Sequence, residues 1–164
     1  MTSREMLAQF PGMSALVIGD ICLDRWCRYD PSLAEPSRET GIPRIAVVKT
    51  EITPGAGGTV ANNLAAMGVG RVSVLGVTGD DGFAYELRQA LAARKIESDL
   101  LVKLPGWCTF TYTKVIDGVT DIEDRPRLDF IATGDLPEIA ESQILEHLRR
   151  VAPEIGRASC RERV

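Results

Sequence analysis

The chain has 164 residues, of which 45% are hydrophobic and 26% charged, which is enough apolar material for one globular core. Its 19 Lys and Arg and 23 Asp and Glu give a net charge of −4, which disfavours a broad nucleic-acid or anionic-membrane surface. A run of about 18 apolar residues is missing, so no membrane-spanning helix is predicted. The four cysteines have irregular spacing and give neither a disulfide framework nor a paired metal site. We therefore expect a reduced, cytoplasmic protein.

The first half of the chain alternates strand and helix patterns. Residues 15–20 form an apolar run ending in Gly-Asp, which predicts a buried parallel strand leading into a polar loop. Residues 24–43 are rich in Pro, Ser, Arg and Glu without a steady period, and we expect a loop or a small excursion from the sheet. The glycine-rich residues 53–59 predict a turn before a helix over 60–67, which Gly68 would cap.

The second half continues this alternation and then changes. Strands are predicted over 71–76 and 99–104, with Asp81 as the N-cap of a helix over 83–94 between them. Strict alternation then predicts a strand over 109–116, and Asp117-Gly118 is a hairpin signal whose partner strand should include 127–130. A last amphipathic helix is predicted over 138–151.

These elements predict an α/β fold with a parallel sheet. The segment after the first strand and the hairpin imply a second, mostly antiparallel layer over the carboxyl edge of that sheet. Ligands of open α/β sheets bind at this edge.

The glycine-rich turn is the first candidate binding element, because glycines let a backbone approach a ligand and a helix start presents free N–H groups. It is not a phosphate-binding P-loop, since no Gly-Lys-Ser/Thr follows, and its spacing differs from the dinucleotide fingerprint. A tight structural turn is an equally good interpretation.

Polar and aromatic residues after the first strand are further candidates. Carboxylates of Asp20 and Asp24 at a strand end can accept hydrogen bonds from sugar hydroxyls, although loop solvation or capping is an equal alternative. We expect Trp26 and Tyr29 to pack, with pocket lining as the alternative. The cysteines at 22, 27 and 108 have no His partners and are expected to be core thiols.

Several short motifs occur in a specific order along residues 16–153. They are Gly19-Asp20-Ile21-Cys22-Leu23-Asp24, Ser37 to Pro43, Pro54 to Gly68, Gly76 to Asp81, Thr109 to Lys114, and Arg127-Leu128-Asp129-Phe130. Together they resemble the N-terminal half of a ribokinase-like (PfkB-type) carbohydrate kinase, most of all its heptose phosphate kinase branch.

The resemblance implies an α/β fold in which a ribokinase-like parallel sheet is flanked by helices and carries a small β lid. Residues 1–153 would form the N-terminal part of this kinase domain, with lid segments at about 24–50 and 108–131, and the domain would be truncated. Such enzymes transfer the γ-phosphoryl group of ATP, with Mg²⁺, to a hydroxyl of a small-molecule sugar or sugar phosphate. A homodimer formed through the lids is also implied.

The resemblance also implies roles for individual residues. Asp24 falls where the family binds sugar hydroxyls, and residues Gly55, Ala56, Gly57, Gly58 and Thr59 fall on the glycine motif that cradles the sugar. Asn63 matches an asparagine near that site, and Glu39 matches the lid edge of the heptose branch. Lys114 lies where a cation could meet a sugar phosphate, or is a solvated strand lysine. Ala56 and Thr59 depart from the Gly and Asn usual in the branch.

The catalytic half of the family is missing from this sequence. No Gly-Ala-Gly-Asp motif, which supplies the base and the anion hole, occurs here. We therefore assign no catalytic residue, no metal site and no nucleotide site to the chain, and expect ATP and Mg²⁺ to bind the complete enzyme. The alternatives are a non-catalytic sugar-binding or regulatory protein on the same half-fold and, less favoured, a nucleoside kinase.

Residues 154–164 have no apolar periodicity. On composition they are a charged terminus, but the string resembles a translated sequencing adapter. We therefore expect a non-native tail and natural sequence that stops near Pro153.

Truncation makes a prediction about stability. A half-fold leaves an open sheet edge and uncovered apolar surface, so the expressed chain should aggregate or melt broadly at low temperature. Differential scanning calorimetry tests this expectation, and a sharp cooperative transition in a monomer would contradict it.

Overall fold

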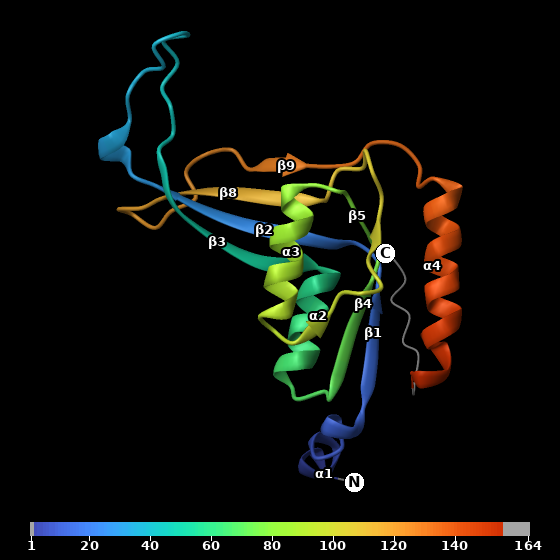
Figure 1. Ribbon diagram of the computed structural model, residues 1–164. Helices are drawn as coiled ribbons and strands as arrows, with labels where there is room; N and C mark the ends of the chain where they lie inside the picture. Colours follow the sequence, from blue (N-terminus) through green and yellow to red (C-terminus); the bar gives the residue numbers. More distant parts are fainter. Residues whose placement is uncertain (1, 156–164) are drawn as a thin grey trace.

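The computed structural model describes residues 2–155, and its main layer is a parallel sheet (Figure 1). The strands β1 (Ser14–Ile18), β4 (Arg71–Leu75) and β6 (Ile96–Glu97) lie in the order β1-β4-β6, all parallel. The helices that follow the strands are α2 (Gly57–Ala66), α3 (Gly82–Ala92) and α4 (Glu138–Val151). This arrangement confirms the predicted α/β class with helices around a parallel sheet.

Alternation along β4 explains why helices cover both faces of the main sheet. Val72 and Val74 are buried in the core with Ala61 of α2 and Leu87 of α3. Ser73 points the other way, toward the end of α4, and Figure 1 shows α4 on the opposite side of the sheet from α2 and α3. The same core takes in the first residues of the next strand, because Ile21 and Leu23 belong to it.

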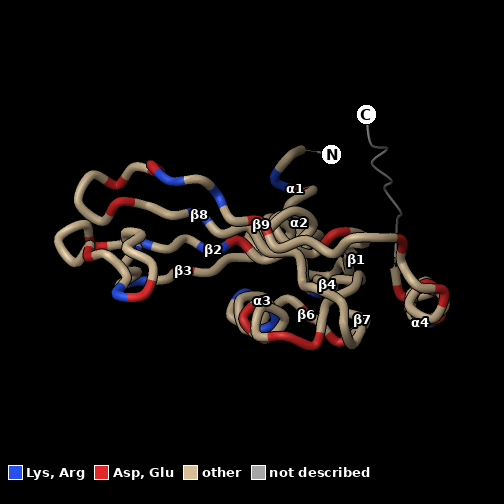
Figure 2. The backbone as a smooth tube through the Cα atoms, turned by 90° about the horizontal axis from the view of Figure 1, so that it is seen from above, with Lys and Arg blue, Asp and Glu red and all other residues tan. Residues whose placement is uncertain are grey.

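A second sheet leaves the main layer and extends past α3 (Figures 1 and 2). It comprises β2 (Ile21–Tyr29), β3 (Val47–Ala56), β8 (Thr111–Asp117) and β9 (Leu128–Phe130), in the order β3-β2-β8-β9. The pairs β2–β3 and β8–β9 are antiparallel, as expected for this layer, whereas the central pair β2–β8 is parallel.

The remaining described elements are short. Strands β5 (Val77–Thr78) and β7 (Val102–Lys103) pair in parallel, α1 (Ser3–Leu7) precedes β1, and 3₁₀ turns occupy Phe10–Gly12, Pro31–Leu33 and Ala152–Glu154. Within residues 2–155, no helix is long and apolar enough to cross a membrane.

Of the two expectations for residue 24 onward, the loop is wrong for residues 24–29, because β2 continues to Tyr29, and the strand lies in the second sheet, as an excursion from the main sheet would. Its inner positions include Arg25, a charge that interrupts the apolar alternation by which a half-buried strand is recognised. Irregular structure begins only at Asp30, whose side chain caps the 3₁₀ turn by accepting from the Ser32 N–H at 2.9 Å.

Two further boundaries differ from the sequence prediction. The third strand of the main sheet is Ile96–Glu97, not 99–104, because residues 102–103 pair with β5 in a separate two-stranded piece. The predicted turn at 53–59 is the end of β3 followed directly by α2, which begins at Gly57. Because glycine has a low helix propensity, the two glycines at the start of this helix predict a turn instead.

Other predicted features are confirmed. The last helix spans Glu138–Val151 as expected. The Asp81 carboxylate caps α3 by accepting from the Ala84 N–H at 2.8 Å. Gly68 lies at φ +88°, and its N–H donates to the Ala65 carbonyl at 3.0 Å, which closes α2 as a glycine cap does.

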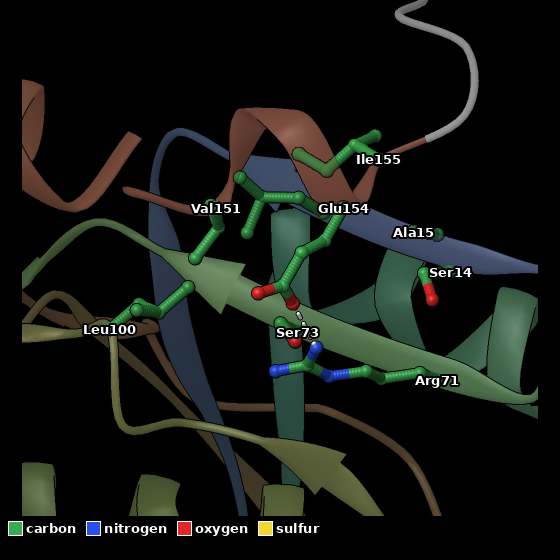
Figure 3. Close-up of a pocket in the computed structure, with 9 residues that line it drawn as sticks. Ser14, Ala15, Arg71, Ser73, Leu100, Val151, Glu154 and Ile155 are labelled. Atoms are coloured by element: carbon green, nitrogen blue, oxygen red, sulfur yellow. Dashed lines mark hydrogen bonds and ion pairs between the residues drawn. The ribbon is translucent and has the colours of Figure 1, made fainter. Parts of the chain in front are cut away.

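The expected non-native tail overlaps the described residues at two positions. Glu154 accepts an ion-pair contact from Arg71 at 2.6 Å, and Ile155 lies beside β1 (Figure 3). Residues 156–164 lie outside the described residues, and the boundary at Pro153 stays a prediction.

Ala56, between β3 and α2, makes a testable strain prediction. Its backbone lies at φ 47° and ψ −117°, a region in which essentially only glycine is unstrained, at a cost of about 1–3 kcal/mol. Ala56→Gly should relieve this strain, but glycine also makes the unfolded chain more flexible, which offsets part of the gain. We therefore expect the free energy of unfolding, measured by urea titration, to rise by about 1 kcal/mol.

Ala66→Gly is the matched control. Ala66 is also exposed, but it has ordinary helical geometry in α2, so glycine there should lower the free energy of unfolding by about 0.5–1 kcal/mol. A loss of stability in both variants would contradict the strain at Ala56.

Candidate functional site

The second sheet has two unlike faces because its side chains alternate. On β2 and β8 the side chains of Leu23, Cys27, Thr111 and Val115 are buried and lie on the α3 side. Among the neighbours that point the opposite way, Asp24, Trp26, Tyr112 and Lys114 are partly exposed. We name this second side the open face; its candidate residues are Asp24, Trp26, Tyr112 and Lys114, with Arg127 beside them.

Asp24 is the central carboxylate of the open face. It lies in mid-strand, opposite Thr53 of β3 and Tyr112 of β8. Gly55 leaves the room that this carboxyl group occupies: a Cβ at residue 55 would come within 2.8 Å of Asp24 Oδ1. Partial burial raises the pKa of Asp24 above its usual value, and the positive charges of Lys114 and Arg127 act against that rise.

The two cations are each held on an aromatic ring. Lys114 Nζ lies 3.8 Å from the centroid of the Trp26 ring, and the Arg127 guanidinium lies 4.8 Å from that of Tyr112. Arg127 also donates two hydrogen bonds to Asp129, at 2.6 and 2.7 Å, and this lowers the pKa of the Asp129 carboxyl. The open face therefore carries two carboxylates and two cations on aromatic surfaces, a combination suited to a polyhydroxylated, anionic ligand.

The glycine motif has a packing role that accounts for its small residues. A Cβ at Gly57 would lie 2.7 Å from Ile21 Cδ1, and one at Gly58 would lie 2.6 Å from Pro54 Cβ. The Thr59 hydroxyl donates to the Pro54 carbonyl at 3.2 Å. These contacts fasten the start of α2 to the β2–β3 ladder, next to Gly55 and Asp24.

Two candidates are not brought to Asp24 by these contacts. Asn63 is an exposed residue on α2. Glu39 is exposed in the connection between β2 and β3, which projects from the far end of the second sheet (Figure 1). Sugar-binding roles for both stay predictions.

Trp26, Tyr112 and Arg127 belong to the candidate site but were not assigned to it from the sequence. The signal that could have found them is the two-residue period that places Trp26 on the face of Asp24 and Tyr112 on the face of Lys114. Missing β2 as a strand concealed this period.

Cys22 is a buried thiol on the same side of β2 as Asp24, and both side chains lie against Gly55. Its side chain is 1% exposed, and burial, with the negative charges of Asp24 and Asp20, raises its pKa to about 12. The thiol therefore stays protonated at neutral pH and does not act as a nucleophile.

A cavity of about 320 Å³ adjoins the beginning of β2, within the size range of ligand pockets. It lies at the carboxyl ends of β1 and β4, the edge where open α/β sheets bind ligands. Its lining is mostly apolar and includes Ile18, Asp20, Trp107, Phe110, Leu136 and Ile144.

A second cavity lies under the end of α4 (Figure 3). It has a volume of about 20 Å³, which is room for one water molecule and not for a sugar. Among residues 2–155 no group of three or more His, Cys, Asp or Glu side chains is placed to hold a metal ion.

The fold agrees with sequence comparison. A sequence profile of the pfkB family carbohydrate kinases matches residues 14–147, and the chain therefore belongs to that family.

Relatives within the family are longer than this chain. The bifunctional protein HldE of Nitrosococcus oceani is 39% identical over 124 residues, which are 76% of this chain and 25% of that protein. HldE of Vibrio cholerae is 31% identical over 153 residues, which are 93% of this chain and 30% of that protein. The chain thus spans less than a third of these curated relatives.

Solved structures of sugar kinases share the fold. Phosphofructokinase-2 of Escherichia coli, solved with fructose-6-phosphate, has a TM-score of 0.55 and 18% identity over 84% of this chain and 42% of that chain. Ribokinase of Arabidopsis thaliana, solved with ribose and ATP, has a TM-score of 0.55 and 17% identity with the same coverage. The described residues therefore have the ribokinase-like fold.

The charge balance at Asp24 makes a prediction about its pKa. Lys114→Met removes a positive charge that opposes the effect of burial, so the pKa of Asp24 should rise further above the ordinary value of 3.8. NMR titration of the Asp24 carboxyl carbon measures this pKa directly. The control is Lys103→Met, since Lys103 lies in β7 and pairs with Asp80 at 2.7 Å; there the pKa of Asp24 should not move.

The raised pKa of Asp24 also determines how the stability of the fold should change with pH. Because the Asp24 pKa is higher in the folded than in the unfolded chain, the folded state holds this proton more tightly. The protonation of Asp24 therefore stabilises the folded chain at low pH. This contribution to the free energy of unfolding should be lost as the pH rises from the Asp24 pKa of the unfolded chain to that of the folded chain. Asp24→Asn should remove that component, and an unchanged Asp24 pKa in Lys114→Met would contradict the proposed balance.

Proposed function

We propose that this chain is the acceptor-binding part of an ATP-dependent carbohydrate kinase, and that the open face binds the sugar. The observation that supports it is that the open face brings the Asp24 carboxylate under the influence of two positive charges, those of Lys114 and Arg127. Membership of the pfkB carbohydrate kinase family gives the reaction: transfer of the γ-phosphoryl group of ATP to a sugar hydroxyl.

In this proposal each group on the open face contacts a different part of the acceptor. The Asp24 carboxylate, for which Gly55 leaves room, accepts hydrogen bonds from two sugar hydroxyls. Lys114 and Arg127 pair with an anionic group, so the acceptor is a sugar phosphate, in keeping with the heptose phosphate kinase branch. Trp26 and Tyr112 offer ring faces to the apolar side of the sugar.

The glycine motif and two outlying residues complete the proposed site. Since the Gly57 N–H donates to the Asp20 carbonyl at 2.9 Å, the Gly58 and Thr59 N–H groups at the start of α2 would face the acceptor in this proposal, and Asn63 lies on the same helix. We infer that segments 24–50 and 108–131 form a lid. The apolar side chains of Ile42 and Val48 at its outer end, 66% and 59% exposed, would be covered by a second copy, and Glu39 would act there.

Phosphoryl transfer itself needs groups beyond those described. ATP with Mg²⁺ supplies the phosphoryl group and the charge that stabilises its transfer. The sequence has no Gly-Ala-Gly-Asp motif, so we propose that this chain binds and orients the acceptor and excludes water from it, and that the base and nucleotide pocket belong to the remainder of the complete enzyme.

Isothermal titration calorimetry on the chain tests the acceptor site, with sedoheptulose 7-phosphate and fructose 6-phosphate as probes. Asp24→Asn should weaken binding of either sugar phosphate by at least about tenfold, because a charge-assisted hydrogen bond is lost. Lys114→Met should weaken the sugar phosphates by about tenfold and the unphosphorylated sugars by less than about twofold.

The controls separate a sugar site from a general anion site. Lys103→Met should bind like the unmodified chain, because Lys103 lies in β7, outside the second sheet. Binding of inorganic phosphate as tight as that of the sugar phosphates, or unchanged affinity in Asp24→Asn, would refute the acceptor site. A reading frame that continues past Pro153 without the catalytic aspartate motif would instead favour a non-catalytic sugar-binding protein.

A further inference from the structure

Arg25 is a half-buried cation on the side of β2 that faces away from the candidate site. Its Nε donates to Glu86 Oε2 of α3 at 2.9 Å, and its Nη2 donates to Glu86 Oε1 at 3.4 Å. The two side chains are 22% and 31% exposed, so the pair is shielded from much of the solvent. The same guanidinium lies 5.2 Å from the centroid of the Phe83 ring.

Phe83 extends this contact to another strand of the second sheet. Its ring centroid is 4.7 Å from that of Phe130 on β9, with the ring planes tilted by 52°. The cluster of Arg25, Phe83, Glu86 and Phe130, which we name the α3 brace, therefore joins one helix to β2 and β9. The two strands are separated by β8 in the sheet, so the brace supports the sheet across its width.

The α3 brace lies where the second sheet leaves the main layer, so it can support the part of the sheet that extends beyond it. Figures 1 and 2 show that β2, β3 and β8 extend past α3, so the sheet leaves the main layer near this helix. Ion pairs farther out, such as Arg28–Asp121 and Lys49–Glu51, join residues of the second sheet and its loops to one another and add no support from the main layer.

The brace and the candidate site are joined by the backbone of β2, because Arg25 is the sequence neighbour of two site residues. Arg25 lies between Asp24 and Trp26, and alternation directs these neighbours onto the open face. A change in the position of Arg25 therefore moves both side chains together.

We propose that the α3 brace holds the second sheet at the orientation in which Asp24 and Trp26 meet the sugar. Arg25 and Glu86 are thus positioning residues for acceptor binding, a role that rests on the function proposed above. Because a partly buried charge that loses its partner is costly, removing one member of the pair should disturb the sheet as much as removing both.

The first test measures affinity for sedoheptulose 7-phosphate. Arg25→Met and Glu86→Gln should each weaken binding by about fivefold to twentyfold, and the double variant should be no weaker than either single one. Arg25→Lys, which keeps a cation facing Glu86 and Phe83, should recover part of the loss. Urea unfolding of each variant identifies the conditions in which it is folded, and affinities are compared there.

A matched control uses an ion pair away from the second sheet. Arg71 and Glu97 pair at 2.9 Å on the main sheet, with about half of each side chain exposed. Arg71→Met and Glu97→Gln should leave the affinity unchanged within about twofold, since exposed pairs contribute little.

The second test reads the orientation of the sheet without a sugar. Spin labels at Val119→Cys, in an exposed loop of the second sheet, and at Met67→Cys, at the end of α2, report the distance between the two layers by double electron–electron resonance. The background carries Cys108→Ala and Cys160→Ala, while Cys22 and Cys27 are buried and stay unlabelled. We expect a narrow distance distribution that broadens in Arg25→Met and in Glu86→Gln.

Each combination of results decides the proposal. Broader distributions together with weaker binding support it. Unchanged distributions overturn the brace, and broader distributions with unchanged affinity overturn its positioning role. If the unmodified chain binds no sugar phosphate, the proposed acceptor site fails, and the role of Arg25 and Glu86 in acceptor binding fails with it; broader distributions would then support the mechanical brace alone.

Discussion

The placement of the candidate site depends on the burial of Ile21 and Leu23. Both side chains belong to the core between the main sheet and its helices, and Leu23 is fully buried. Burial of such a side chain contributes about 1.5–3 kcal/mol, and a slip of one residue would turn both toward solvent. The alternation of β2 is therefore set from its first residues, and this directs Asp24 and Trp26 to the open face.

The candidate site contains features that lower the stability of the fold. Partial burial makes the ionised form of Asp24 unfavourable, and nearby cations offset only part of that cost. Ala56, which pairs with Ile21 across the β2–β3 ladder, holds a backbone conformation that favours glycine. Strain and a destabilised charge gathered at one place are typical of a binding site and not of a packing element.

Membership of the pfkB family identifies the fold more firmly than the ligand, because one fold can carry many functions. What distinguishes this chain is the set of groups on its open face, above all the cations Lys114 and Arg127 on the rings of Trp26 and Tyr112. The proposal of an acceptor with a negative charge rests on these groups. Gly57 and Gly58 of the motif, by contrast, are accounted for by the close packing of α2 against β2 and β3.

Much of this structure could be predicted from local sequence patterns. The order of strands and helices, the cap at Asp81, the end of α2 at Gly68 and the bounds of α4 all depend on neighbouring residues, and these predictions are confirmed. Asp24 and Lys114 were recognised as candidates through the resemblance of ordered motifs. The predictions that were wrong are β2 as a loop and 99–104 as a strand of the main sheet, where partners distant in sequence decide the structure.

The sequence by itself therefore determined the α/β class, the family and the identities of the polar groups. Only the tertiary structure decided which of those groups meet. Arg25 can occupy an inner strand position because Glu86 and Phe83, some sixty residues later, compensate its charge. Trp26, Tyr112 and Arg127 join Asp24 because β2 and β8 pair in parallel. The two-residue period of a strand gives the face on which a side chain lies, but it does not give the strand or helix that this face meets, since that depends on packing between segments far apart in the sequence.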